Sequence, residues 1–281
     1  MSLKSTPAEP NNSKPAEQTP SNSFLIKTYR YFTDRPHQQK AIAYLEQQQS
    51  VETLAEFTRL WRDDSSDPQE QPKRLVDKIV AYMKLKGYQI YTTDGKRNIV
   101  YVEGMNVDGT LNDDSPDVWN DIRCVFEYRD GNPEMLGVWG ATTEPGRYYT
   151  ENPLNPDGCA RIQFGQYKAW QVGSHGTSQP HEALVQCDNI TVCRDLNEDY
   201  SRKGDQLYTG DHFGVNQHWG GDSPIEAIGR WSAGCLVGRT RDGHREFMKI
   251  VKEDPDYLRN RAYAFATTVI AGDDLVKLFP D

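Results

Sequence analysis

The stretch from residue 123 to residue 139, RCVFEYRDGNPEMLGVW, indicates the fold class of the chain. It holds two short apolar runs, Arg123–Tyr128 and Met135–Trp139, separated by Asp, Gly, Asn and Pro residues that are typical of turns. Closely spaced runs of this kind predict strands of a β-rich, mostly antiparallel domain. The same pattern recurs beyond Gly87, at Gln89–Tyr91, Asn98–Val102, Arg161–Phe164, Leu184–Gln186 and Ile190–Val192.

Two segments with helical periodicity accompany these runs. Apolar side chains lie three and four positions apart in residues 73–86 and again in Gly243–Lys252. After the second segment, Ala262–Ile270 has the composition of a final strand. We therefore expect an α+β domain over residues 74–281, with one helix before the strands and one near the end.

The chain before residue 74 divides into three parts by composition. Residues 1–23 are polar and rich in Pro, Ser and Asn, which predicts a disordered tail. Residues 24–62 carry two short helical patterns and predict a small helical hairpin, either a packed unit or a docking module for a partner. Residues 63–73 contain two prolines and no periodicity, as a linker does.

The net charge of −9 restricts the partners. Nucleic acids and anionic membranes favour a basic surface, so we expect neither as a partner. No apolar stretch is long enough to span a membrane, and the N-terminus lacks the apolar core of a classical signal peptide. We expect a protein that is cytoplasmic as synthesised and that reaches any target outside the membrane by a non-classical route.

Five cysteines stand at positions 124, 159, 187, 193 and 235, without CxxC or other zinc spacing. We therefore expect no metal site of this kind and no cofactor. Without a signal peptide, reduced thiols are expected. Cys187 and Cys193 flank Asp188-Asn189, a candidate hairpin turn, so a disulfide between these two cysteines is an alternative. An odd count leaves one thiol available as a nucleophile.

The segment from His218 to Cys235, HWGGDSPIEAIGRWSAGC, joins a histidine, a Gly-rich loop and a cysteine. A thiol is mostly protonated at neutral pH, and an imidazole titrates close enough to neutrality to take its proton. Gly234 can adopt backbone angles closed to other residues, and the N–H groups of residues 233–235 can form an oxyanion hole. Ser232 can steady the loop or the histidine through its hydroxyl. The segment predicts Cys235 as nucleophile and His218 as base.

This segment resembles the L,D-transpeptidase catalytic domain, also called the YkuD-like domain. That family carries a histidine, a loop of similar length with an Ile-Gly pair, and Ser/Thr-x-Gly-Cys. Here these are His218, Ile228-Gly229 and Ser232-Ala233-Gly234-Cys235. Trp219 follows the histidine where the family has Gly, and Leu236-Val237-Gly238 places the next arginine, Arg239, later than in the family. These departures bear on the substrate more than on the nucleophile.

The resemblance implies a bacterial or phage cysteine acyltransferase or peptidase that acts on peptidoglycan stem peptides. Cys235 would attack a peptide carbonyl and form a thioester, which an amine resolves in transpeptidation and water resolves in hydrolysis. Two alternatives stay open. One is a catalytically silent cell-wall-binding or structural module of a phage or secretion apparatus, and the other is an intracellular cysteine peptidase.

Four further residues are candidate substrate contacts: His212, Trp231, Arg239 and Arg194. His212 precedes His218 by six positions and is either a second site histidine or a solvated loop residue. Arg194 is suited to orient a substrate carboxylate or to form a structural ion pair.

Three weaker patterns remain. His175 and His181 bracket a loop-like segment, which is either the rim of a cleft or a solvated loop. Asp195-x-Asn197-x-Asp199 begins like a calcium loop but lacks the Gly and Glu expected later in it. Residues 98–122 hold six acidic side chains and no Lys or Arg, which indicates a solvated loop or a cation site.

Overall fold

The computed structural model describes residues 74–280, which belong to a compact unit at Glu70–Asp281. The predicted tail at 1–23, helical hairpin at 24–62 and linker at 63–73 lie outside the described residues. None of the helices within 74–280 is long and apolar enough to cross a membrane. The described fold is thus that of the predicted β-rich domain.

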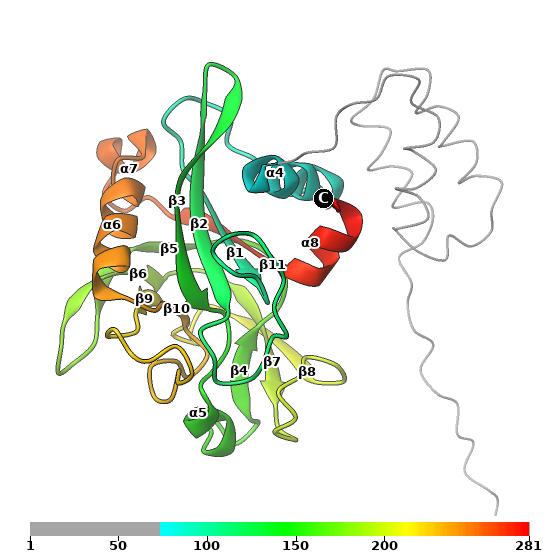
Figure 1. Ribbon diagram of the computed structural model, residues 1–281. Coiled ribbons are helices and arrows are strands. Elements are labelled where there is room, and N and C mark those ends of the chain that lie inside the picture. The colour runs from blue at the N-terminus through cyan, green and yellow to red at the C-terminus, as the bar shows by residue number, and fades with distance from the viewer. Residues whose placement is uncertain (1–73, 281) are drawn as a thin grey trace, which may run out of the picture. The chain divides into compact units, whose positions relative to one another are not determined.

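Eight strands form a closed barrel (Figure 1). Around the barrel they follow the order β1 (Asn98–Glu103), β11 (Phe265–Ala271), β5 (Gly165–His175), β6 (His181–Gln186), β9 (Gln217–Trp219), β10 (Leu236–Gly238), β3 (Asn132–Thr142) and β2 (Asp121–Arg129). Six neighbouring pairs are antiparallel, and β1–β11 and β9–β10 are parallel. The parallel pair β9–β10 brings together the two ends of the segment from His218 to Cys235.

The longest pairing in the barrel joins β2 to β3, the stretch that indicated the fold class. Asp130 and Gly131 connect the two strands and have positive φ values of 51° and 79°. Two consecutive positive φ values belong to a type I′ turn, whose twist matches that of the strands and which Asp-Gly favours. This turn sets the register between β2 and β3, and β3 pairs with β10 on its other edge.

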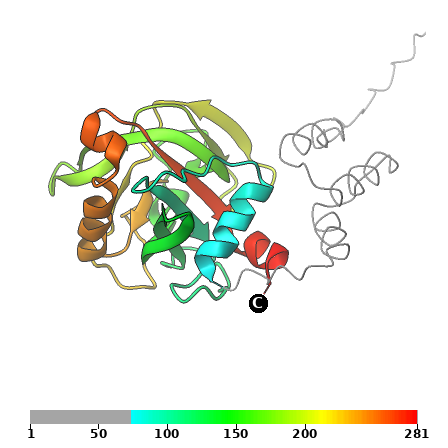
Figure 2. The ribbon, with the colours of Figure 1, turned by 90° about the horizontal axis from the view of Figure 1, so that it is seen from above.

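Helices cover the barrel on two opposite sides (Figure 2). On one side lie α4 (Leu75–Leu85) and α8 (Gly272–Leu278), and on the other lie α6 (Arg241–Val251) and α7 (Pro255–Arg259). Tyr101 and Val125 face the inner core, which α6 closes with Phe247, whereas Val100 and Ile122 face the outer core beneath α4 and α8. Strands β1 and β2 are therefore buried on both faces.

A separate three-stranded antiparallel sheet contains β4 (Cys159–Ile162), β7 (Ile190–Asp195) and β8 (Gln206–Gly210), and the short helix α5 (Arg147–Glu151) precedes it. The hairpin turn predicted at Asp188-Asn189 is wrong, because β6 before it belongs to the barrel and β7 after it to this sheet. The five cysteines are all free.

The α+β class with mostly antiparallel strands is confirmed, as are the helices predicted at 73–86 and 243–252. The strand predicted at Gln89–Tyr91 is wrong: side chains of other segments, not a strand ladder, satisfy its backbone. Three further helices, α5, α7 and α8, accompany the two that the periodicity predicted. Gly165–His175 was missed because its side chains are mixed in polarity and half-buried.

Candidate active site

The loop before β10 presents Cys235, and its shape depends on Ser232. The Ser232 hydroxyl donates a hydrogen bond to the Cys235 carbonyl (2.9 Å) and accepts one from the Gly234 N–H (3.1 Å). The Ser232 carbonyl in turn accepts the Gly146 N–H at 2.9 Å. Ser232 is fully buried, so these bonds hold the loop in one shape. Its hydroxyl engages the loop and not the histidine.

Gly234 is required by the backbone at this turn. Its φ is +115°, a conformation that residues with a Cβ rarely adopt. A Cβ placed here would also lie 2.3 Å from the Ala160 carbonyl oxygen of β4. The nucleophile loop therefore lies directly against the three-stranded sheet.

The Cys235 thiol is neutral at rest. The residue is partly exposed, and its thiol donates to the Gly214 carbonyl oxygen at 3.5 Å. Burial raises the pKa of the thiol to about 11, with the Asn216 backbone N–H acting in the opposite sense. Since a thiol reacts as the thiolate, Cys235 needs a base at the moment of attack.

Two backbone N–H groups beside the thiol are unused. The Gly234 N–H is engaged by Ser232, whereas those of Ala233 and Cys235 form no hydrogen bond within residues 74–280. Free donors next to a nucleophile can bind a developing oxyanion, with about 3 kcal/mol lost for each donor removed. Of the N–H groups of residues 233–235 that were predicted to form an oxyanion hole, those of Ala233 and Cys235 are therefore available and that of Gly234 is not.

His218 lies on the neighbouring strand and faces the same side of the sheet as Cys235. In the parallel pair β9–β10, His218 is opposite Val237, two positions after the cysteine. The cysteine thus lies just before β10, and the base candidate lies on the strand that pairs with it. In the resting structure no hydrogen bond within residues 74–280 joins the thiol to the ring, because the thiol is turned to Gly214.

The tautomer of His218 follows from its one hydrogen bond. Its Nδ1 lies 2.8 Å from the Trp219 carbonyl oxygen. A carbonyl only accepts, so Nδ1 carries the proton and Nε2 carries the lone pair. Burial, and next the neighbouring His175, lowers the pKa of His218 to about 3. The ring is therefore neutral at physiological pH and can accept a proton at Nε2.

Three other histidine rings gather around His218, and we call the four rings the histidine cluster. His175 stacks on His218 with 3.9 Å between ring centroids, and His181 lies 5.9 Å from it. His244 of α6 lies 5.7 Å from His181. The prediction left the solvated-loop reading open for His175 and His181. The structure instead places them on β5 and β6 and in contact with the base.

In each of these three rings, the nitrogen without a proton already accepts a hydrogen bond. Asn216 donates to His175 Nδ1 (3.0 Å), the Trp219 N–H donates to His181 Nε2 (3.4 Å), and Arg123 donates to His244 Nδ1 (3.2 Å). His218 Nε2 has no such donor among residues 74–280. Within the histidine cluster, His218 is thus the ring that can take a proton without losing a hydrogen bond.

The remaining predicted contacts fall in different places. Trp231 packs, together with Cys235, on the small apolar cluster of Trp119, Ile228 and Val237. Arg239 donates to the Ser223 carbonyl oxygen at 3.1 Å and so holds the loop between His218 and Cys235. His212 is exposed, and its ring nitrogen lies 3.3 Å from Asp211.

Arg194 lies between the nucleophile loop and a cavity of about 390 Å³. It is opposite Ala160, the residue that contacts Gly234, and its guanidinium lies 5.5 Å from the Phe213 ring, next to Gly214. Within residues 74–280 it has no carboxylate partner, which argues against the ion-pair alternative. The cavity is lined by Asp157, Arg194, Leu196, Asn197, Gly204, Asp205, Gln206 and Tyr208.

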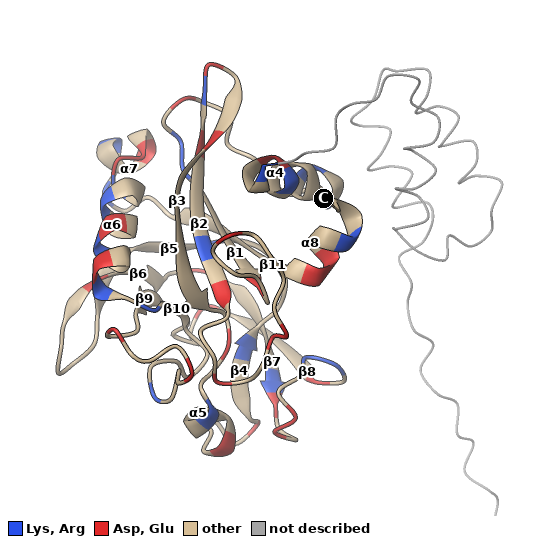
Figure 3. Cartoon of the chain, viewed as in Figure 1, with Lys and Arg blue, Asp and Glu red and all other residues tan. Residues whose placement is uncertain are grey.

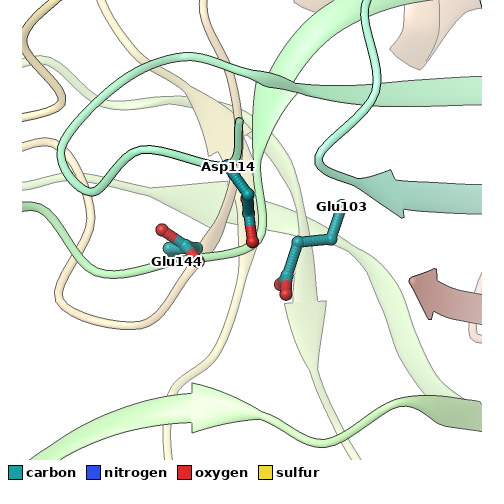
Figure 4. A group of neighbouring side chains, drawn as sticks. All are labelled: Glu103, Asp114 and Glu144. Atoms are coloured by element: carbon teal, nitrogen blue, oxygen red, sulfur yellow. The ribbon is translucent and has the colours of Figure 1, made fainter. Parts of the chain in front are cut away.

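A second buried polar group, which we call the carboxylate–arginine cluster, lies on the other side of β4. The carboxylates of Glu103, Asp114 and Glu144 face a common centre (Figure 4) and are close enough to share a metal ion. Arg161 of β4, however, binds both Glu103 and Glu144, and Arg202 binds Glu103. Figure 3 shows charged positions within β2 and β4. In this cluster the arginines already offset the two glutamates.

The carboxylate–arginine cluster holds an additional proton. The Thr143 hydroxyl lies 2.6 Å from Glu103 and 2.9 Å from Asp121, but it has one proton to donate. The other contact is satisfied if one of the two carboxyls is protonated. Burial and the charge of Glu103 raise the pKa of Asp121 to about 7, so Asp121 carries this proton near neutrality.

No protein-family model matches the chain, and neither does a characterised protein or a solved structure. The assignment of chemistry therefore depends on the geometry described here and on the resemblance of the segment from His218 to Cys235.

Asn216 is a site residue that the sequence did not reveal, and His175 was considered there only as the rim of a cleft or part of a solvated loop. Asn216 pairs by its backbone with Leu236, contacts the thiol by its N–H and reaches His175 by its side chain. An available signal was its position two residues before His218, which places both on one face of a strand. His175 carries no such signal, because the closed barrel alone brings β5 and β6 to β9.

Proposed function

We propose that this domain is a cysteine acyl-transfer enzyme acting on peptide bonds, with peptidoglycan stem peptides as the substrate class. The observation that carries the proposal is that neighbouring paired strands hold a partly exposed thiol and the one ring of the histidine cluster whose basic nitrogen is unoccupied. Catalytic thiols need such a base, and structural cysteines do not.

The chemistry begins with the proton of the Cys235 thiol. As a substrate carbonyl arrives, the thiol leaves the Gly214 oxygen and passes its proton to His218 Nε2. The S–H bond breaks, an N–H bond forms, and the sulfur attacks the carbonyl carbon. The Ala233 and Cys235 N–H groups bind the oxyanion. When the tetrahedral intermediate collapses, the C–N bond breaks and the proton on Nε2 moves to the leaving amine, which yields a thioester.

The second half of the reaction resolves the thioester. An amine or a water molecule gives its proton to His218 Nε2 and attacks the thioester carbonyl, and the C–S bond breaks. The released thiolate takes the proton back from His218. An amine acceptor makes the enzyme a transpeptidase, and water makes it a peptidase.

Support for a peptide substrate comes from Arg194 and the adjoining cavity. A guanidinium without a carboxylate partner within residues 74–280, which lines a cavity, is suited to bind a substrate carboxylate. Stem peptides carry such carboxylates. Their choice over other peptides rests on the resemblance to L,D-transpeptidases and not on the cavity.

The test is an intact-mass measurement of the full chain after incubation with a carbapenem, a β-lactam that acylates cysteine transpeptidases. We expect one adduct in the wild-type protein and in Cys187→Ala, which removes an exposed thiol as a matched control. Cys235→Ala should form none. An adduct that persists in Cys235→Ala, or that disappears in Cys187→Ala, contradicts the proposal.

A second candidate function is a silent wall-binding module, and the raised pKa of Cys235 favours it. An active-site thiol is expected to have a lowered pKa, whereas this one is raised and directed to Gly214. Binding to purified sacculi without any change in their muropeptide profile would support this function. A changed profile that depends on Cys235 supports the enzyme.

A further inference from the structure

We propose that His175 is a positioning residue for the base: a ring held neutral by Asn216, against whose face His218 lies while it holds the proton of Cys235. This inference rests on the proposed function of Cys235 and His218. It adds a residue on a third strand, β5, to a site otherwise built from β9 and β10.

The contact between the two rings is close and nearly parallel. His175 and His218 have 3.9 Å between centroids and an angle of 11° between planes. His218 is buried, so its ring has little freedom to leave this stack. With Nδ1 also bound to the Trp219 carbonyl, both the plane and the rotation of the ring are set, and Nε2 points in one direction.

The tautomer of His175 follows from Asn216. The Asn216 side-chain oxygen accepts the backbone N–H of Gln186 at 2.9 Å, which fixes the orientation of the amide. Its NH₂ group therefore faces His175 Nδ1, 3.0 Å away, and donates to it. His175 Nδ1 is an acceptor, and the proton of this ring is on Nε2. The stacked rings carry opposite tautomers.

This hydrogen bond resists protonation of His175. A proton on Nδ1 would place two donors against each other, the ring N–H and the Asn216 NH₂. Burial, and next the neighbouring His181, also lowers the pKa of His175. When His218 takes the thiol proton, the ring stacked on it thus stays neutral. A neutral aromatic face stabilises a cation, whereas a second imidazolium would repel it.

The other titratable groups near His218 do not share this role. His181 and His244 are neutral rings held by the Gln179 and Glu182 carbonyls, and neither stacks on His218. Arg123, which binds His244, is charged and disfavours an imidazolium at His218. Among the groups that face His218 within residues 74–280, His175 is the one whose ring stacks on it and so fixes its plane.

Asn216 also connects this support to the nucleophile. Its carbonyl accepts the Leu236 N–H at 3.0 Å, immediately after Cys235, and its own N–H contacts the thiol. One residue therefore holds the tautomer of His175 and the backbone beside Cys235. Asn216 therefore links the ring that positions His218 to the backbone that positions Cys235.

The experiment measures the rate of Cys235 acylation by a carbapenem as a function of pH in the full chain. Asn216→Asp keeps the side-chain shape but replaces the donor with an acceptor, which allows His175 to become charged. We expect a fall of about tenfold at pH 7 and recovery at high pH, where His175 loses the added proton. Asn132→Asp, at the exposed start of β3, is the matched control and should behave as wild type.

Two His175 variants separate positioning from folding. His175→Phe keeps an aromatic face that cannot be charged and should retain most of the rate, while His175→Ala should lose about tenfold at every pH. A merely structural role predicts equal loss in both, without a change of pH profile. That result, or a wild-type profile for Asn216→Asp, overturns the proposal.

Nitrogen-15 NMR of the imidazole rings tests the inference apart from the enzymatic reaction. We expect His175 as the Nε2–H tautomer and His218 as the Nδ1–H tautomer at pH 7. An Nδ1–H tautomer at His175 overturns the inference even if Cys235 is acylated. If Cys235 is never acylated, the proposed function fails, and the tautomers then show independently whether Asn216 locks His175.

Discussion

The molecule contains two buried polar clusters, one on each side of β4. One cluster holds ionised side chains, and the rings of the other are neutral. In the carboxylate–arginine cluster, Glu103 and Glu144 are ionised and are offset by Arg161 and Arg202. In the histidine cluster the four rings are neutral, and each is held in one tautomer by its hydrogen bonds. In the first cluster the two glutamates already have arginine partners, whereas in the second one basic nitrogen is unoccupied.

This difference bears on our proposal that the histidine cluster takes part in a reaction. A charged group whose partners are all in place gains little from a ligand and mainly holds chain segments together. A neutral group with an unoccupied basic nitrogen can change its protonation state during a reaction. Strand β4 joins the two, because Ala160 contacts the nucleophile loop and the next residue, Arg161, binds Glu103 and Glu144.

The largest expected effect comes from removing the charge at the centre of the carboxylate–arginine cluster. Arg161→Met leaves Glu103 and Glu144 without a shared partner, and breaking a buried ion pair in this way costs about 3–5 kcal/mol. Urea unfolding monitored by tryptophan fluorescence measures the loss. Arg245→Met, which breaks an exposed pair with Asp242, is the control and should cost less than about 1 kcal/mol. Equal losses in the two variants would mean that this cluster does not hold the fold together.

The next effect tests the contact that joins the clusters. Gly234→Ala introduces a Cβ at φ +115° and 2.3 Å from the Ala160 carbonyl oxygen, and we expect a loss of about 2–3 kcal/mol together with slower alkylation of Cys235. Gly204→Ala is matched to it, with φ +92° but no atom within 4 Å of the added Cβ. The control should show only the conformational cost, about 1 kcal/mol, and unchanged alkylation. If both variants lose the same stability, the contact with β4 does not constrain the loop.

The smallest expected effect concerns one proton of the carboxylate–arginine cluster, the one on Asp121. The folded pKa of Asp121 is raised to about 7 from an ordinary value near 3.8, so the folded state holds the extra proton between these values. The contribution of Asp121 to stability is therefore fully present below about pH 4 and is lost as pH rises through about 7, at about 1 kcal/mol per pH unit. Unfolding of wild type and Asp121→Asn at pH 5, 6 and 7 should show a stability difference that changes with this slope. A difference that does not vary with pH would exclude the proton on Asp121.

The loop that carries Cys235, and its connection to His218, could be read from the sequence because they are local. Ser232, Gly234 and Cys235 act through bonds within a few residues, and His218 is joined to them by one loop. The β-rich class could also be predicted from the sequence, since runs such as Arg123–Tyr128 alternate with turn residues.

The remainder of the site depends on contacts between distant segments. His175 reaches His218 because β5 and β6 join β9 in the closed barrel, and no local pattern encodes that order. Arg161 and Glu144 looked like ordinary surface charges in the sequence, whereas their mutual pairing permits their burial. The acidic residues between 98 and 122, for which a solvated loop was one expectation, include Glu103 and Asp121, which are buried.

The parallel pairing of β1 with β11 has a consequence for how the chain folds. It joins the first and the last strand of the barrel, with Ile99 opposite Thr267. Contacts so distant in sequence form late and slowly, because a long loop must close before they stabilise anything. Until β11 inserts between β1 and β5, both strands present unpaired edges that can bind a second chain. Insertion of β11 is therefore the expected rate-limiting step of refolding, and the interval before it is when aggregation competes.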